Sequence, residues 1–275
     1  MLGKLFKHDF KSTMRFGIPM LIAIAAVCVA GSANAPFMIS LMSQTETSTG
    51  LVILSLLSFF LEMLVVIALT AIPTIILVIV LIDYYKSTVS DEAYLTFTLP
   101  VTPTQILVSK LLNAVLWSAI MTVASVIAGI LISFFTTLAE DAFYPGGGYE
   151  ESVEGIGYSG AGAMIVLLIA YAAVTVVVQI LMYFMAISFS SSITRKNKGL
   201  AAIGFAFIAH TIYGVVNYII IIVAVIIGVV AGIEVDNPFV VINTTLAIMT
   251  AVSIGFGVLF FFLTRRILER KLNLS

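Results

Sequence analysis

The sequence predicts an all-α integral membrane protein with six transmembrane helices. Three observations lead to this fold class: a mean hydropathy of +1.19, a composition of 61% hydrophobic and only 10% charged residues, and a series of long apolar runs separated by short polar segments. A soluble domain is typically about 45–50% apolar and about 25% charged. The composition therefore excludes a soluble enzyme and a disordered chain, and a bilayer must solvate most of the residues.

Each apolar run is long enough for one span, which needs about 20 residues. We predict spans over about residues 16–40, 51–82, 104–139, 161–190, 199–231 and 239–264. These spans and their short connections use almost all of the sequence. Residues 1–275 are therefore expected to form a single transmembrane domain.

The first predicted span is preceded by an amphipathic segment. Its apolar residues recur at helical spacing, and basic residues occupy the other side, which predicts a helix lying in the headgroup plane as an elbow before the span. Ala33-Asn34-Ala35 resembles a signal-peptidase site. Because Pro36 follows it directly, we expect the first span to be retained rather than cleaved.

The distribution of basic residues predicts the orientation. All 13 lysines and arginines lie at the N-terminus, in or beside the second and fourth connections, or at the C-terminus. The first, third and fifth connections carry only acidic charges. Positive residues accumulate on the cytoplasmic side of membrane proteins, so both termini are expected in the cytoplasm.

Several catalytic motifs are missing from the sequence. There is no P-loop, no HExxH and no glycine-rich dinucleotide fingerprint, and the single cysteine, Cys28, excludes a disulfide within the chain. The string Gly157-Tyr158-Ser159-Gly160 matches the GxSG of intramembrane serine proteases, with His210 as a possible base. Ser159 lies in a predicted outer loop, whereas His210 lies about 16 Å into a span, so we do not expect a protease or any catalytic residue.

The second connection, residues 83–117, mixes charges with apolar residues. Ser90 could cap a short helix, and Pro100 and Pro103 predict a turn. Thr102 and Gln105 then form a weak capping box for the third span. The segment suits either a loop lying on the lipid surface or a docking element for a cytoplasmic protein.

This connection resembles a known family. The run Asp91-Glu92-Ala93-Tyr94-Leu95-Thr96-Phe97-Thr98-Leu99-Pro100-Val101, followed by Thr102 to Lys110, is similar to the first cytoplasmic loop of bacterial type-2 ABC exporter permeases. In that family an acidic-Gly/Ala-Tyr-Leu stretch leads into Leu-Pro-Val and then into a Ser-Lys at the head of the third span. The similarity covers about 20 contiguous residues.

The resemblance implies a permease subunit in the bacterial cell membrane that dimerises, with a second copy or a related permease, around a translocation path. A separate cytoplasmic P-loop ATPase would bind ATP and Mg²⁺, so this chain would hold no cofactor and would not itself be an enzyme. The second connection would be the coupling helix that docks on the ATPase. The implied coupling residues are Asp91, Glu92, Tyr94, Leu95, Phe97, Leu99, Pro100 and Lys110. Membrane lipids are further expected partners, and nucleic acid is not.

Some polar residues lie inside the predicted spans. Glu62 is near the midplane, where an ionisable group is costly and should face protein or water. His210, Gln179 and Asn217 are further candidates for a translocation path, although helix packing explains such residues equally well. Two other functions remain open: an ion- or proton-coupled transporter that uses Glu62 and His210, and a scaffold or sensor that recruits a cytoplasmic protein. Tyr84 and Tyr85 are predicted to lie in the interfacial aromatic belt.

Overall fold

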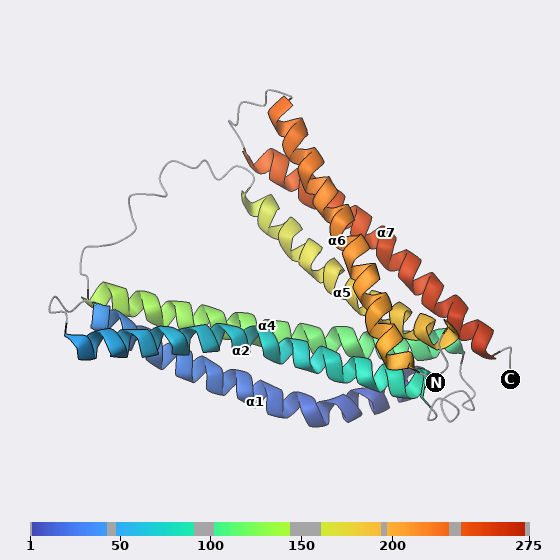
Figure 1. Cartoon of the computed structure of the whole chain (residues 1–275), viewed down its shortest axis with the longest axis horizontal. Coiled ribbons are helices and arrows are strands. Elements are labelled where there is room, and N and C mark those ends of the chain that lie inside the picture. The colour runs from blue at the N-terminus through green and yellow to red at the C-terminus, as the bar shows by residue number, and fades with distance from the viewer. Residues whose placement is uncertain are drawn as a thin grey trace. The chain divides into compact units, whose positions relative to one another are not determined.

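The computed structural model describes residues 2–42, 48–90, 102–143, 161–193, 197–230 and 238–272. These ranges consist almost entirely of helix (Figure 1). The helices in chain order are α1 (Leu2–Met42), α2 (Thr49–Thr88), α4 (Pro103–Phe143), α5 (Ala161–Ile193), α6 (Lys198–Val230) and α7 (Pro238–Leu272).

Within the described residues, six helices are long and apolar enough to cross a membrane. Their outward surfaces carry large apolar side chains, including Ile22, Phe60, Ile130 and Phe207, that are more than half exposed in the isolated chain. Water solvates such continuous apolar surface poorly, whereas lipid solvates it well. The predicted all-α fold, with six helices that are able to span a membrane, is confirmed.

The amphipathic N-terminal segment is not a separate helix in the structure, because α1 runs without interruption from Leu2 to Met42. The side chains of Asp9 and Thr13 in this segment are buried. The Phe10 ring stacks on Trp117 of α4, with ring centroids 5.2 Å apart. Part of the predicted elbow is therefore packed against another helix.

The chain divides into two compact units. Unit 1 contains residues 1–7, 81–115 and 157–275, and unit 2 contains residues 8–80 and 116–156. The divisions at 80/81 and 115/116 fall inside α2 and α4. Each of these helices therefore contributes one end to each unit.

Unit 2 is held by apolar packing among α1, α2 and α4. Its buried core consists of Ile24, Ile76, Trp117, Met121 and Ala128. Gly17 is essential to this packing, because a Cβ atom added there would overlap the Trp117 ring. Small residues allow membrane helices to approach closely, and dispersion contacts then supply much of the association energy.

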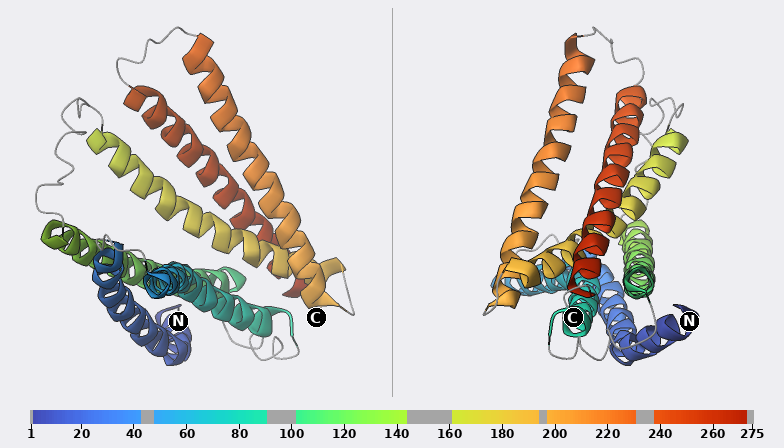
Figure 2. Two further views of the ribbon diagram at one scale, coloured as in Figure 1. Left: turned by 60° about the vertical axis from the view of Figure 1, so that its left-hand side comes forward. Right: turned by 90° about the vertical axis from the view of Figure 1, so that its right-hand side faces the viewer.

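Unit 1 is centred on α5, which packs against both α6 and α7 (Figure 2). Its buried core contains Val178, Leu181 and Met182 of α5, Tyr213 of α6 and Phe260 of α7. The Tyr213 hydroxyl lies 2.8 Å from Ser253 Oγ of α7. This hydrogen bond joins α6 to α7.

Candidate functional site

The candidate site lies in unit 1 at the ends of α2 and α4 that flank residues 91–101. Tyr84, in the last turns of α2, is fully buried. Its ring stacks on Phe184 of α5 with a centroid separation of 3.9 Å and an interplanar angle of 9°. The prediction that Tyr84 belongs to an interfacial belt is therefore wrong, because protein rather than lipid headgroups surrounds its ring.

The Tyr84 hydroxyl completes this contact. It lies 2.7 Å from Ser188 Oγ on α5, and Ser188 is itself buried. The Thr88 hydroxyl donates to the Tyr84 carbonyl oxygen at 2.6 Å. We call Tyr84, Thr88, Phe184 and Ser188 the Tyr84 cluster; it fixes the end of α2 to α5.

The start of α4 is fixed beside the same end of α2. Lys110 Nζ forms an ion pair with Asp83 Oδ2. The Lys110 side chain is only 7% exposed, whereas that of Asp83 is 38% exposed. A charge buried to this extent needs a partner to offset its lost hydration, so the ion pair is an integral part of this helix contact.

The predicted capping box at the start of α4 is confirmed. The Gln105 backbone N–H donates to Thr102 Oγ1 at 3.4 Å, and the Thr102 backbone N–H donates to Gln105 Oε1 at 3.2 Å. Pro103 is the first helical residue. The two side chains satisfy backbone donors that the first helical turn leaves without partners.

The start of α6 also reaches this region. Lys198 Nζ donates to the Val89 carbonyl oxygen at 3.4 Å, and Val89 is buried. The first residue of α6 is thereby linked to Val89, which follows α2 directly. Ser90 and Thr102 flank residues 91–101, the predicted docking segment. Each lies next to a helix end that is packed within unit 1.

Of the coupling residues that the family resemblance implies, only Lys110 lies within the described residues, and it is paired. The other implied coupling residues lie outside the described residues: Asp91, Glu92, Tyr94, Leu95, Phe97, Leu99 and Pro100. The Gly157–Gly160 string also lies outside them.

Glu62 belongs to a separate polar network in unit 2. Asn34 Nδ2 of α1 donates to Glu62 Oε2 of α2 at 3.2 Å and to the Ser58 carbonyl oxygen at 3.0 Å. The Ser58 hydroxyl donates back to Asn34 Oδ1 at 2.8 Å. The only acid predicted near the midplane therefore faces protein, as its cost in lipid requires.

The other intramembrane candidates have different surroundings. Asn217 is buried, accepts a hydrogen bond from the Tyr171 hydroxyl at 3.4 Å and donates to the Tyr213 carbonyl oxygen at 2.9 Å. Gln179 is half-buried on α5, and His210 is exposed on α6. The bond from Tyr171 joins α5 to α6, whereas the bond to Tyr213 lies within α6, so Asn217 has a packing role between these two helices.

Two partners in these contacts, Asn34 and Ser188, are not predicted by the sequence. Asn34 stands in the string that resembles a signal-peptidase site, and Ser188 belongs to no motif. In both cases the only indication in the sequence of a contact between helices is a polar residue inside a predicted span. Among the described residues, no group of three His, Cys, Asp or Glu side chains is placed to hold a metal ion.

Comparison of the chain with protein-family models, with curated proteins and with solved structures finds no match. The site is therefore interpreted from its own residues and from the resemblance of residues 91–110.

Proposed function

We propose that this chain is the membrane-spanning permease subunit of an ATP-driven exporter in a bacterial cell membrane. A separate cytoplasmic ATPase would bind and hydrolyse ATP, and residues 91–101 would form its docking segment. The permease would act as a dimer, with a second copy or a related chain. This chain would then supply the translocation path and the coupling surface, but not the chemistry.

The observation that carries the proposal is the anchoring on both sides of residues 91–101. The Tyr84 cluster holds the preceding helix, and the Asp83–Lys110 ion pair holds the following helix beside it. A loop that only lies on lipid needs no such support. A loop that transmits a displacement does need it, because motion at its tip would otherwise be absorbed at its ends.

The contacts also suggest where a displacement would go. Phe184 and Ser188 lie on α5, and α5 is the helix against which both α6 and α7 pack. A push on residues 91–101 would therefore reach these three helices as a packed group. Discrete shifts of packed helices are a common way to change which side of a membrane path is open.

The proposal is tested by affinity purification of the full chain from its native host in mild detergent. We expect an ATPase to copurify and to hydrolyse ATP. Tyr94→Glu combined with Leu95→Glu should release that ATPase while the permease still inserts, because two charges would replace the apolar anchors. Phe143→Glu, an apolar-to-acidic change at the far end of α4, is the matched control and should retain the ATPase.

Retention of the ATPase by the Tyr94/Leu95 variant would overturn the docking assignment. Absence of any ATPase, together with proton or ion movement by the purified chain in liposomes, would favour the coupled-transporter alternative. In that case Glu62→Gln should abolish the movement, although its amide oxygen can still accept the hydrogen bond from Asn34. Partner binding through residues 91–101 without ATP hydrolysis would favour a scaffold.

A further inference from the structure

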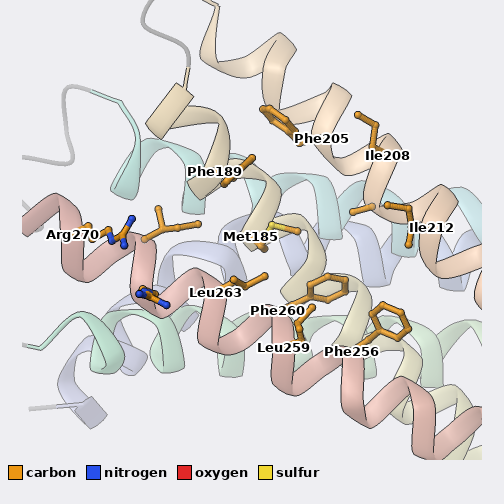
Figure 3. A pocket seen from close by; sticks show the side chains of 13 residues that line it. Met185, Phe189, Phe205, Ile208, Ile212, Phe256, Leu259, Phe260, Leu263 and Arg270 are labelled. Atoms are coloured by element: carbon orange, nitrogen blue, oxygen red, sulfur yellow. The ribbon is translucent and has the colours of Figure 1, made fainter.

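A groove of about 640 Å³ lies among α5, α6 and α7, entirely within unit 1. Binding sites for small molecules typically enclose about 300–1,000 Å³. Aromatic and aliphatic side chains line most of the groove (Figure 3), with Phe189 on α5, Phe205 and Ile212 on α6, and Phe256 and Leu263 on α7. Its interior is therefore suited to hydrocarbon.

One end of the groove is positively charged. Arg266 and Arg270 line it from successive turns of α7, and Figure 3 shows Arg270 at the opposite end from Phe256. Neither arginine forms an ion pair with an acidic side chain in the part of the chain that the structure describes. The neighbouring Arg265, by contrast, donates to Glu269 Oε1 at 2.7 Å.

This combination selects an amphiphile with an anionic head. An apolar body alone would suit any lipid, but two arginines that have no acidic partner among the described residues favour a phosphate, which guanidinium groups bind with directed hydrogen bonds. Basic pockets between membrane helices on the cytoplasmic side are known to bind anionic lipid headgroups. The positive-inside distribution predicts the cytoplasmic side for this end of α7.

The length of the groove agrees with a membrane lipid. Phe256 and Arg270 are 14 residues apart on α7, which corresponds to about 21 Å along a helix. One leaflet with its headgroups is about 20–22 Å thick, half of a bilayer. Ile208, Ile212 and Leu259 are about half exposed, so a lipid can enter sideways from the bilayer.

We propose that this groove binds one anionic phospholipid of the cytoplasmic leaflet. The phosphate lies between Arg266 and Arg270, and an acyl chain lies along the aromatic side chains towards Phe256. The inference rests on the predicted orientation of α7 and requires no ATPase, so it can fail or succeed independently of the exporter function.

The first test is native mass spectrometry of the purified full chain, titrated in detergent with dioleoyl-phosphatidylglycerol or dioleoyl-phosphatidylcholine. We expect one phosphatidylglycerol to bind more tightly than phosphatidylcholine. Arg266→Gln combined with Arg270→Gln should weaken phosphatidylglycerol binding by about tenfold or more, because each basic residue near a membrane surface contributes to anionic-lipid affinity. Arg265→Gln, which removes a charge from the same turn, is the matched control and should have little effect.

The second test fills the apolar part of the groove. Ile212→Trp should reduce binding of both lipids, whereas Ile203→Trp, on the opposite face of α6 and 70% exposed, should not. Equal affinity of the unmodified chain for the two lipids would overturn the proposal. An equal loss in the Arg265 variant, or unchanged binding in the Ile212 variant, would overturn it as well, provided that gel filtration shows the variants to be folded.

Discussion

Units 1 and 2 each enclose a large aromatic side chain, Tyr84 and Trp117, and the two are held by different contacts. In unit 1, the Tyr84 ring is stacked on Phe184 and its hydroxyl is hydrogen-bonded to Ser188. In unit 2, the Trp117 ring is equally enclosed, but its indole N–H has no hydrogen-bond partner among the described residues. Both rings are stacked on a phenylalanine, Tyr84 on Phe184 and Trp117 on Phe10, but only Tyr84 adds a hydrogen bond.

These two kinds of contact should respond differently to substitution. Lipid provides little hydrophobic drive for helices to associate, so membrane helices rely on close packing and interhelical hydrogen bonds. Close packing, as around Trp117, is sensitive to added volume. A polar contact such as Tyr84–Ser188 specifies one helix register, because the two groups meet in that register only.

The largest expected effect is at Tyr84. Tyr84→Ala should lower the free energy of unfolding by about 3–5 kcal/mol, because it removes a buried ring and leaves a cavity. Tyr84→Phe should cost only about 1 kcal/mol, since the stack remains and one hydrogen bond is lost. The measurement is thermal unfolding in detergent micelles, followed by circular dichroism.

Tyr85→Ala provides the control for this comparison, because Tyr85 is only partly buried on the same helix. An equal loss at both tyrosines would contradict the assignment of Tyr84 to a specific buried cluster.

An intermediate effect is expected at Gly17. Gly17→Ala should destabilise unit 2 by about 1–3 kcal/mol, because the added methyl group overlaps the Trp117 ring and forces the helices apart. Trp117 is the only tryptophan in the chain, so its fluorescence reports the change directly. Gly129→Ala is the matched control, since a Cβ there meets nothing within 4 Å. Similar spectra and melting temperatures for the two variants would argue against close packing at Gly17.

The smallest expected effect is a difference in coupling energy between two ion pairs of unit 1. A double-mutant cycle with Asp83→Asn and Lys110→Met should give a coupling energy of about 1–2 kcal/mol, since the lysine is buried and the aspartate is partly screened. The same cycle with Arg265→Gln and Glu269→Gln should give about 0.3–0.5 kcal/mol, because both side chains are 43% exposed. Equal coupling energies in unfolding measurements would show that burial does not distinguish the pairs.

Features encoded locally were predictable from the sequence. Continuous apolar runs gave the six spans, and the three-residue spacing of Thr102 and Gln105 gave the capping box. Both signals depend on residues that are neighbours on one helix. The cost of Glu62 in lipid predicted that its carboxylate faces protein or water, and the structure gives it a protein partner, Asn34.

Contacts between helices could not be predicted in the same way. Asn34 and Glu62 are 28 residues apart, and Tyr84 and Ser188 are 104 apart. Nothing in a single sequence places α1 beside α2, or the end of α2 beside α5. Tyr84 was assigned to the lipid interface for this reason, because a tyrosine at the end of a span is usually interfacial and its buried partner lies on a distant segment.

The two units share helices rather than being joined by loops, which has a consequence for the backbone of α2 and α4. Both helices pass from one unit to the other without a break, at residues 80/81 and 115/116. Each crossing point is an ordinary helical turn, in which the backbone N–H of one unit's residue donates to a carbonyl about four residues earlier. A change in the helical twist of α2 or α4 in one unit is therefore continued by unbroken backbone hydrogen bonding into the residues of the other.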